Sequence, residues 1–237
     1  MATPNTPQRR HPPVRASIVL LLAGTALYVI PSAVHGNPPV DSAQDTLEYV
    51  RQRPSWRLVH MANILAVLLW AGAFTALAPV AAPASRTLGS WLRVLFTASA
   101  AVFAVYFSLH AFGLSTLADR YTAQGADPAA VLQQTEAVLT ALGSTAFTAQ
   151  AMLGASVALS GAVFSRSHLV PGWVGWCGAV AGTGWLVGAL LVNFAVIVPF
   201  TALTWLWTVM LAVPLWRGAT RETAPPASAV PSGSSGD

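Results

Sequence analysis

The chain carries little charge and no lysine. Of its 237 residues, 8% are charged and 54% are hydrophobic, whereas an average soluble domain has about 25% charged residues. Eight acidic and twelve basic side chains are too few to cover a soluble protein of this length, so most of the surface must face lipid. All twelve basic residues are arginines, and they lie in the terminal tails, in the connections or near the ends of the apolar segments. A nucleic-acid-binding protein would gather them on one face, so the lipid bilayer is the expected partner and nucleic acid is not.

The chain also lacks the motifs of soluble catalytic sites. Its one cysteine, Cys177, lies inside an apolar segment, which excludes an intramolecular disulfide. There is no phosphate-binding loop with lysine, no Cys-x-x-Cys, no His-Glu-x-x-His and no Gly-x-Ser-x-Gly. We therefore expect no cofactor and no metal held by such a motif. Polar residues inside apolar segments remain as candidates, because burying them in a membrane is costly.

Six long apolar segments are present, at 16–34, 58–80, 91–112, 141–164, 170–192 and 194–216. They predict an all-α fold, a polytopic transmembrane helix bundle over residues 16–217. Residues 1–15 and the Pro/Ser/Gly-rich residues 218–237 are predicted to be disordered tails. A cleaved signal peptide is the alternative interpretation of the first segment.

Three helices are expected to reach beyond the bilayer or to lie on it. Residues 45–50 predict a short surface helix, and the third helical pattern continues to Arg120. Asp127-Pro128 is a good start for a helix, and no strong breaker follows before Phe164. The first turns of this fourth helix, with Glu136, are therefore expected to project into water.

The arginines predict an orientation. If the N-terminus is cytoplasmic, Arg51, Arg53, Arg57 and Arg120 lie outside and the other eight lie inside. This asymmetry favours cytoplasmic N- and C-termini. Four tryptophans sit at predicted span ends, as in an aromatic belt: Trp56, Trp91, Trp173 and Trp216.

The fifth segment is rich in glycine, with pairs one turn apart such as Gly178 and Gly182. Small residues at this spacing let another helix approach closely. Two interpretations are open, tight packing inside one bundle or a dimer interface, and the oligomeric state does not follow from the sequence.

One turn carries a family resemblance. The sequence Ser165-Arg166-Ser167-His168-Leu169-Val170-Pro171-Gly172-Trp173-Val174-Gly175-Trp176 resembles a turn of the DUF4386 family of bacterial membrane proteins. Arg57-Leu58-Val59 at the start of the second segment is similar too. The resemblance covers roughly residues 16–217 and implies a six-helix bundle in a bacterial cytoplasmic (inner) membrane. It implies no catalytic residues.

The predicted topology gathers polar residues at the outer ends of the helices. His60 lies about one turn into the second span with Asn63 on the same face, and His110 lies near the outer end of the third span with Tyr106 one turn deeper. His35 ends the first span and Asn193 ends the fifth, and Glu136 is expected to face the same region from the fourth helix. Glu48 and Asp119 lie in the adjoining loops.

These residues allow three hypotheses besides transport, for which no internal repeat is present. The first is a structural role, in which they only bond water and backbone at the interface. The second is a site for a small apolar or lipid-like molecule, with an acid-catalysed enzyme as its catalytic version. In that enzyme Glu136 is the acid, His60 and His110 transfer protons, Asn63 orients the substrate, and Asn193 is a further substrate-binding residue. The third is a bis-histidine haem or metal site at His60 and His110.

The catalytic version is similar to small integral-membrane terpene cyclases, which are compact helical bundles with a few acids among aromatic rings. Aromatic faces would stabilise a carbocation. The candidate rings are those of Trp56, Trp70, Phe103, Tyr106, Phe112 and Trp205.

Overall fold

The computed structural model describes residues 12–36, 38–82 and 85–221. Its elements are α1 (Pro12–His35), α2 (Ala43–Arg51), α3 (Trp56–Ala81), α4 (Arg86–Ser108), the π-helical turn η1 (Leu109–Leu114), α5 (Ser115–Tyr121), α6 (Pro128–Phe164), α7 (Gly172–Leu190) and α8 (Phe194–Arg221). Over these residues the chain is helical and has no strand. Six helical stretches are long and apolar enough to cross a membrane, which confirms the predicted all-α bundle.

The helices are longer than the predicted spans at both ends of the chain. Helix α1 begins at Pro12 and α8 ends at Arg221, so both extend into segments predicted to be tails. The rest of those predicted tails, residues 1–11 and 222–237, lies outside the described residues. The two helix ends meet, because the Arg15 guanidinium donates a hydrogen bond to the Ala219 carbonyl.

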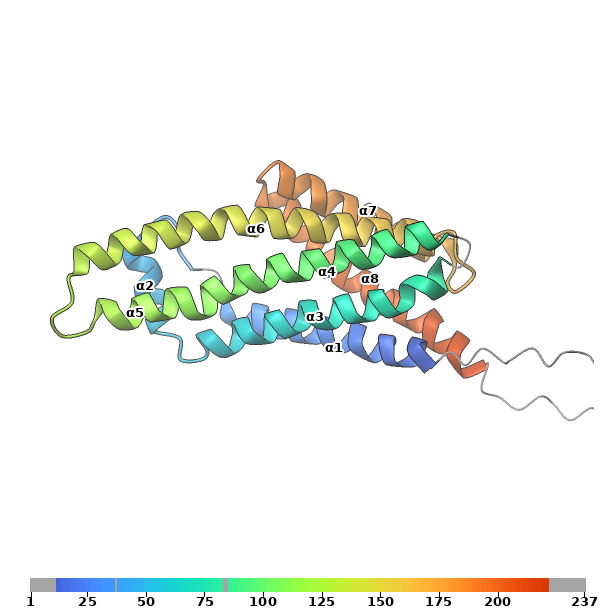
Figure 1. The fold of residues 1–237 in the computed structure, drawn as a ribbon, viewed down its shortest axis with the longest axis horizontal. Helices are drawn as coiled ribbons and strands as arrows, with labels where there is room; N and C mark the ends of the chain where they lie inside the picture. The colour runs from blue at the N-terminus through green and yellow to red at the C-terminus, as the bar shows by residue number, and fades with distance from the viewer. Residues whose placement is uncertain (1–11, 37, 83–84, 222–237) are drawn as a thin grey trace, which may run out of the picture.

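The long helices run side by side along the longest axis of the molecule (Figure 1). Helix α2 crosses one end of this bundle, where it packs on α5 and α6. We call this end, with residues 38–55 and the 122–127 connection, the α2 end. Helices α7 and α8 lie against the other part of the bundle, and the turn between them stops well short of the α2 end (Figure 1).

Two helical stretches reach past a bilayer at the α2 end. Helix α6 has 37 residues, which is about 55 Å at 1.5 Å per residue, against a hydrocarbon core of about 30 Å. Its first turn is capped as predicted, since Asp127 accepts hydrogen bonds from the amides of Ala129 and Ala130. The neighbouring stretch from Arg86 to Tyr121 is 36 residues long. The projecting turns and α2 share a small apolar core that includes Leu47, Val50, Leu117 and Val131.

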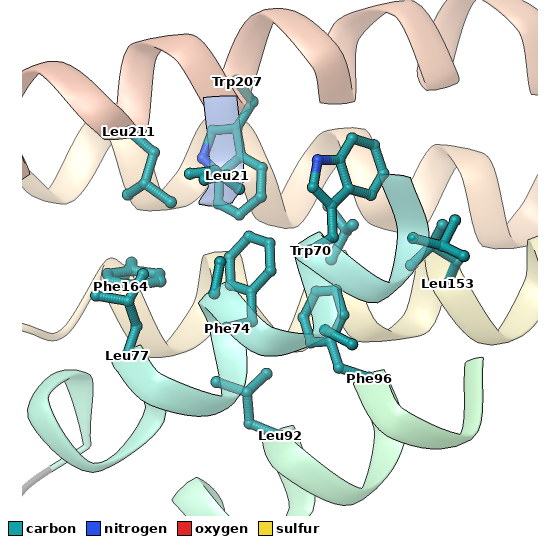
Figure 2. Packing of buried hydrophobic residues seen from close by; sticks show 14 of the residues in the cluster. Leu21, Trp70, Phe74, Leu77, Leu92, Phe96, Leu153, Phe164, Trp207 and Leu211 are labelled. Carbon is teal, nitrogen blue, oxygen red and sulfur yellow. The ribbon is translucent and has the colours of Figure 1, made fainter. Parts of the chain in front are cut away.

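The main core lies between the six long helices α1, α3, α4, α6, α7 and α8. Phe74 stacks on Phe96 at 4.3 Å and on Trp207 at 5.8 Å between ring centroids, and aliphatic side chains such as Leu21 and Leu153 surround them (Figure 2). A membrane protein gains little from excluding lipid tails from such a core, so close contact between side chains must supply much of its stability.

The glycines of α6 and α7 allow close contacts between helices of the same chain. A Cβ atom on Gly161 would lie 2.0 Å from the Ala179 amide nitrogen, and one on Gly182 would lie 2.2 Å from that of Ala158. Gly178 faces the Trp207 ring in the same way. These contacts support the interpretation of tight packing within one bundle rather than a dimer interface.

Candidate functional site

The α2 end brings together three histidine rings from three helical elements. His35 ends α1, His60 lies in the second turn of α3, and His110 lies in η1. The His60 ring stacks on that of His110 at 4.8 Å, and the His35 ring meets His60 edge-on at 4.6 Å. The sequence predicts that His60 and His110 lie close together. They do, and the contact is buried, because the two residues are 3% and 7% exposed. We call the three rings and Trp56 the histidine cluster.

Trp56 lies at the centre of this cluster. Its ring is 4.2 Å from His35, 4.5 Å from His60 and 5.8 Å from His110, measured between centroids. Its Nε1–H donates to the His110 carbonyl at 2.6 Å, and His60 Nδ1–H donates to the Trp56 carbonyl at 2.8 Å. The ring is 2% exposed, whereas Trp91 and Trp173 are about 60% exposed. The prediction that Trp56 belongs to an aromatic belt at the interface is therefore wrong.

The π-helical turn η1 sets how the third span meets α3. Such wide turns occur mostly as single interruptions of α-helices and are frequent at functional sites. At its end the Ser115 hydroxyl donates to the Ala111 carbonyl at 2.6 Å and accepts from Arg57 Nε at 2.8 Å. Arg57 also forms an ion pair with Asp119 at 2.9 Å. The start of α3 is thus tied to η1 and α5 by polar contacts.

Buried polar atoms without partners occur within the cluster and deeper in the interior. Among the described residues, Asn63 Oδ1, His110 Nδ1 and Trp205 Nε1 are buried and have no hydrogen-bond partner. Asn63 is 3% exposed and lies one turn along α3 from His60, on the same face. Native proteins leave few buried polar atoms unpaired, so this part of the interior has unused hydrogen-bonding capacity.

A series of contacts between aromatic rings connects the cluster to the main core. Tyr106 meets His110 edge-on at 4.8 Å, and Phe107 lies 6.1 Å from both His60 and Tyr28. Tyr28 then stacks on Trp70 at 5.7 Å and contacts Trp205 at the same distance. Trp70 and Phe103 belong to the main core, and the Trp70 Nε1–H is already bonded to the Thr25 hydroxyl.

Three predicted site residues lie away from the cluster. Glu136 is exposed on α6, and its neighbour Thr135 is the buried one, so the expectation that Glu136 faces the bundle is wrong. Asn193 is exposed and caps α8 through the Ala195 amide. Its turn packs against the middle of α6, where Phe194 contacts Phe147, so Asn193 does not reach the cluster. Phe112 is 50% exposed and presents its ring outward.

A pocket of about 230 Å³ opens beside the cluster. Trp56 is both a lining residue of this pocket and a member of the histidine cluster, so the two features are adjacent. The charged and polar lining comes from α2 and the residues after it, α3, and α5: Arg51, Arg53, Arg57, Ser115 and Asp119. In the sequence these arginines indicate only topology, because nothing in their spacing shows that α2 folds back onto α5.

The stacked histidines do not fit a shared haem or metal. A metal lies in the plane of each imidazole that binds it, about 2 Å from the nitrogen. The His60 and His110 rings face each other with an interplanar angle of 6°, so they have no common point in both planes. No group of three His, Cys, Asp or Glu side chains is placed to hold a metal in the part of the chain that the structure describes. The hypothesis of a bis-histidine haem or metal site therefore conflicts with this geometry.

The fold and the site define a multi-pass helical membrane protein with a buried histidine cluster at one end of its bundle. The family model for a domain of unknown function, DUF4386, matches residues 19–218. The chain therefore belongs to the DUF4386 family, as the turn at 165–176 predicted. No curated protein and no solved structure matches the chain.

Proposed function

We propose that the α2 end binds a small, largely apolar organic molecule that carries a hydroxyl group. The observation that carries this proposal is the pair of unpartnered atoms, Asn63 Oδ1 and His110 Nδ1. The Asn63 oxygen needs a donor, and a neutral histidine nitrogen pairs with a donor or an acceptor depending on its tautomer. A hydroxyl group is both donor and acceptor, so it can pair with either atom.

The surroundings of the two atoms favour an apolar body for this molecule. Tyr106 contacts the His110 ring and Phe107 contacts the His60 ring, and Phe107 leads through Tyr28 to Trp205. An unpaired buried polar atom costs about 1–3 kcal/mol, and leucine or phenylalanine at these positions would avoid that cost. Retaining asparagine and histidine is therefore easier to explain if a bound molecule supplies the missing hydrogen bonds.

An acid-catalysed cyclase has less support from the same geometry. Such an enzyme needs a carboxyl group shielded from water beside the aromatic faces. Glu136 is exposed, the Asp119 side chain is 73% exposed, and Glu48 is partly exposed and bonded to Gln44. We therefore propose binding and assign no catalytic acid.

The test compares an alcohol with the matching alkane. The purified full-length protein in phosphatidylcholine nanodiscs is titrated with 1-decanol or decane, and its thermal unfolding midpoint is followed. We expect 1-decanol to raise the midpoint saturably and decane to have no such effect. His110→Phe and Asn63→Leu should raise the midpoint of the free protein or leave it unchanged, because they remove an unpaired polar atom, yet both should abolish the response to 1-decanol.

Two results would contradict the proposal. If decane and 1-decanol shift the wild type equally, the molecules are only partitioning into the apolar interior. If both variants destabilise the free protein and keep the response to 1-decanol, the two side chains have structural partners such as buried water, and the site does not recognise a hydroxyl.

A further inference from the structure

The pocket beside the cluster has a surplus of positive charge. Arg51, Arg53 and Arg57 line it, and Asp119 is the one carboxylate among its lining residues. Asp119 is paired with Arg57, and this is the one ion pair within 4.0 Å among the described residues. Two of the three arginines that line the pocket, Arg51 and Arg53, therefore have no carboxylate partner within 4.0 Å among the described residues.

The two remaining arginines differ in how they are held. Arg53 is fixed by neutral groups: its Nε and Nη1 donate to the carbonyls of His35 and Tyr49, and its guanidinium lies 3.2 Å from the centroid of the Tyr49 ring. These contacts orient the side chain without neutralising its charge. Arg51 is exposed and has no hydrogen bond or ion pair to another described residue, so its guanidinium is free to bind a ligand.

We infer that this pocket binds an oxyanion, a phosphate or carboxylate group, between Arg51 and Arg53. A guanidinium donates two parallel hydrogen bonds to such a group, and Arg51 and Arg53 both line the pocket. The volume of about 230 Å³ accommodates a phosphate group with part of its substituent. The free anion and the head group of an anionic lipid share this chemistry. The inference does not depend on the proposed hydroxyl site, because it involves neither His110 nor Asn63.

Two probes distinguish the sources of the anion. In the first arm, the full-length protein in phosphatidylcholine nanodiscs is titrated with inorganic phosphate against chloride at equal ionic strength, and the thermal unfolding midpoint is followed. In the second arm, phosphatidic acid is added to the nanodiscs, and lipid retained per protein chain is measured by native mass spectrometry. Saturation in the first arm identifies a free anion, and saturation in the second identifies a lipid head group. Either result supports the oxyanion site.

The variants give effects of opposite sign. Arg51→Gln should weaken the binding of whichever probe saturates, phosphate or phosphatidic acid, by about tenfold, which is the effect expected for one charge-assisted contact. Asp119→Asn should strengthen it, because it removes the one negative charge and releases Arg57. The matched control is Arg86→Gln, which removes an exposed arginine at the opposite end of the bundle and should have no effect.

The inference is overturned if neither probe saturates. It is also overturned if Arg51→Gln and Arg86→Gln weaken binding equally, because the anion then responds to net charge and not to the pocket. The sign of the Asp119→Asn effect is measurable even if the Arg53 contacts prove necessary for folding, so the test does not rely on altering Arg53.

Discussion

Trp56 links the histidines through both its ring and its Nε1–H, so its replacement should have a large effect. In Trp56→Phe the His110 carbonyl loses the 2.6 Å hydrogen bond, and the smaller ring leaves space between His35 and His60. An unpaired buried carbonyl alone costs about 1–3 kcal/mol. We expect the free energy of unfolding in detergent to fall by at least that amount.

Trp173→Phe is the matched control, since Trp173 is 61% exposed and should tolerate the change to within about 0.5 kcal/mol. Equal destabilisation by the two substitutions would contradict the central position of Trp56. Chemical unfolding of each variant, monitored by circular dichroism, measures the difference.

Whether a site residue points into the bundle was predictable only where several apolar residues on the same helix identify the buried face. His60 and Asn63 share a face with buried apolar neighbours along α3, so the sequence places them inside. Glu136 lies on a stretch of α6 with mixed apolar and polar residues, and a shift of one residue turns the helix by about 100°. The buried residue there is Thr135, and its hydroxyl is satisfied by the Val131 carbonyl.

The other site features had weaker signals in the sequence. Tyr28 is a single aromatic residue in an apolar segment, and nothing in its spacing shows that it meets Trp70 and Trp205. The π-helical turn has no sequence signature that distinguishes it from continuous α-helix. The arginine pocket depends on the chain path after α2, which side-chain periodicity does not encode.

At the scale of the helices, the α6–α7 contact depends on glycine. Gly161→Ala would place a methyl group 2.0 Å from the Ala179 amide nitrogen, so the two backbones must separate. Overpacking of this kind typically costs about 1–3 kcal/mol and at times more. We expect the free energy of unfolding, measured in detergent, to fall by about 1–3 kcal/mol or more.

Gly143→Ala provides a control on the same helix. Nothing lies within 4 Å of a Cβ atom at Gly143, and alanine favours a helix by about 0.5–1 kcal/mol over glycine, so this variant should be equal to the wild type or more stable. If Gly161→Ala behaves like Gly143→Ala, the close approach of α6 and α7 is not present in the protein in its membrane.

At the scale of the whole molecule, the number of spans and their order were predictable because a bilayer requires long apolar helices. The segments 58–80 and 194–216 fall within α3 and α8. How far each helix extends toward the ends of the bundle was less predictable. α7 is only 19 residues long, so its turn to α8 stops short of the α2 end, and this is why Asn193 does not join the histidines.

The arrangement of the helices makes a prediction about topology that labelling can test. The connections around Gln52 and Gln124 both lie at the α2 end, and His168 lies between α6 and α7 at the other end. In a Cys177→Ser background, Gln52→Cys and Gln124→Cys should therefore react alike with a membrane-impermeant maleimide, and His168→Cys should react in the opposite way. The arginine distribution further predicts that positions 52 and 124 react in intact cells, and that position 168 reacts only after permeabilisation.

The reverse pattern would invert the predicted orientation and leave the site intact. Different reactivity at 52 and 124 would contradict the shared end itself, because the histidine cluster and the arginine pocket both require α2 and α5 on one side of the membrane.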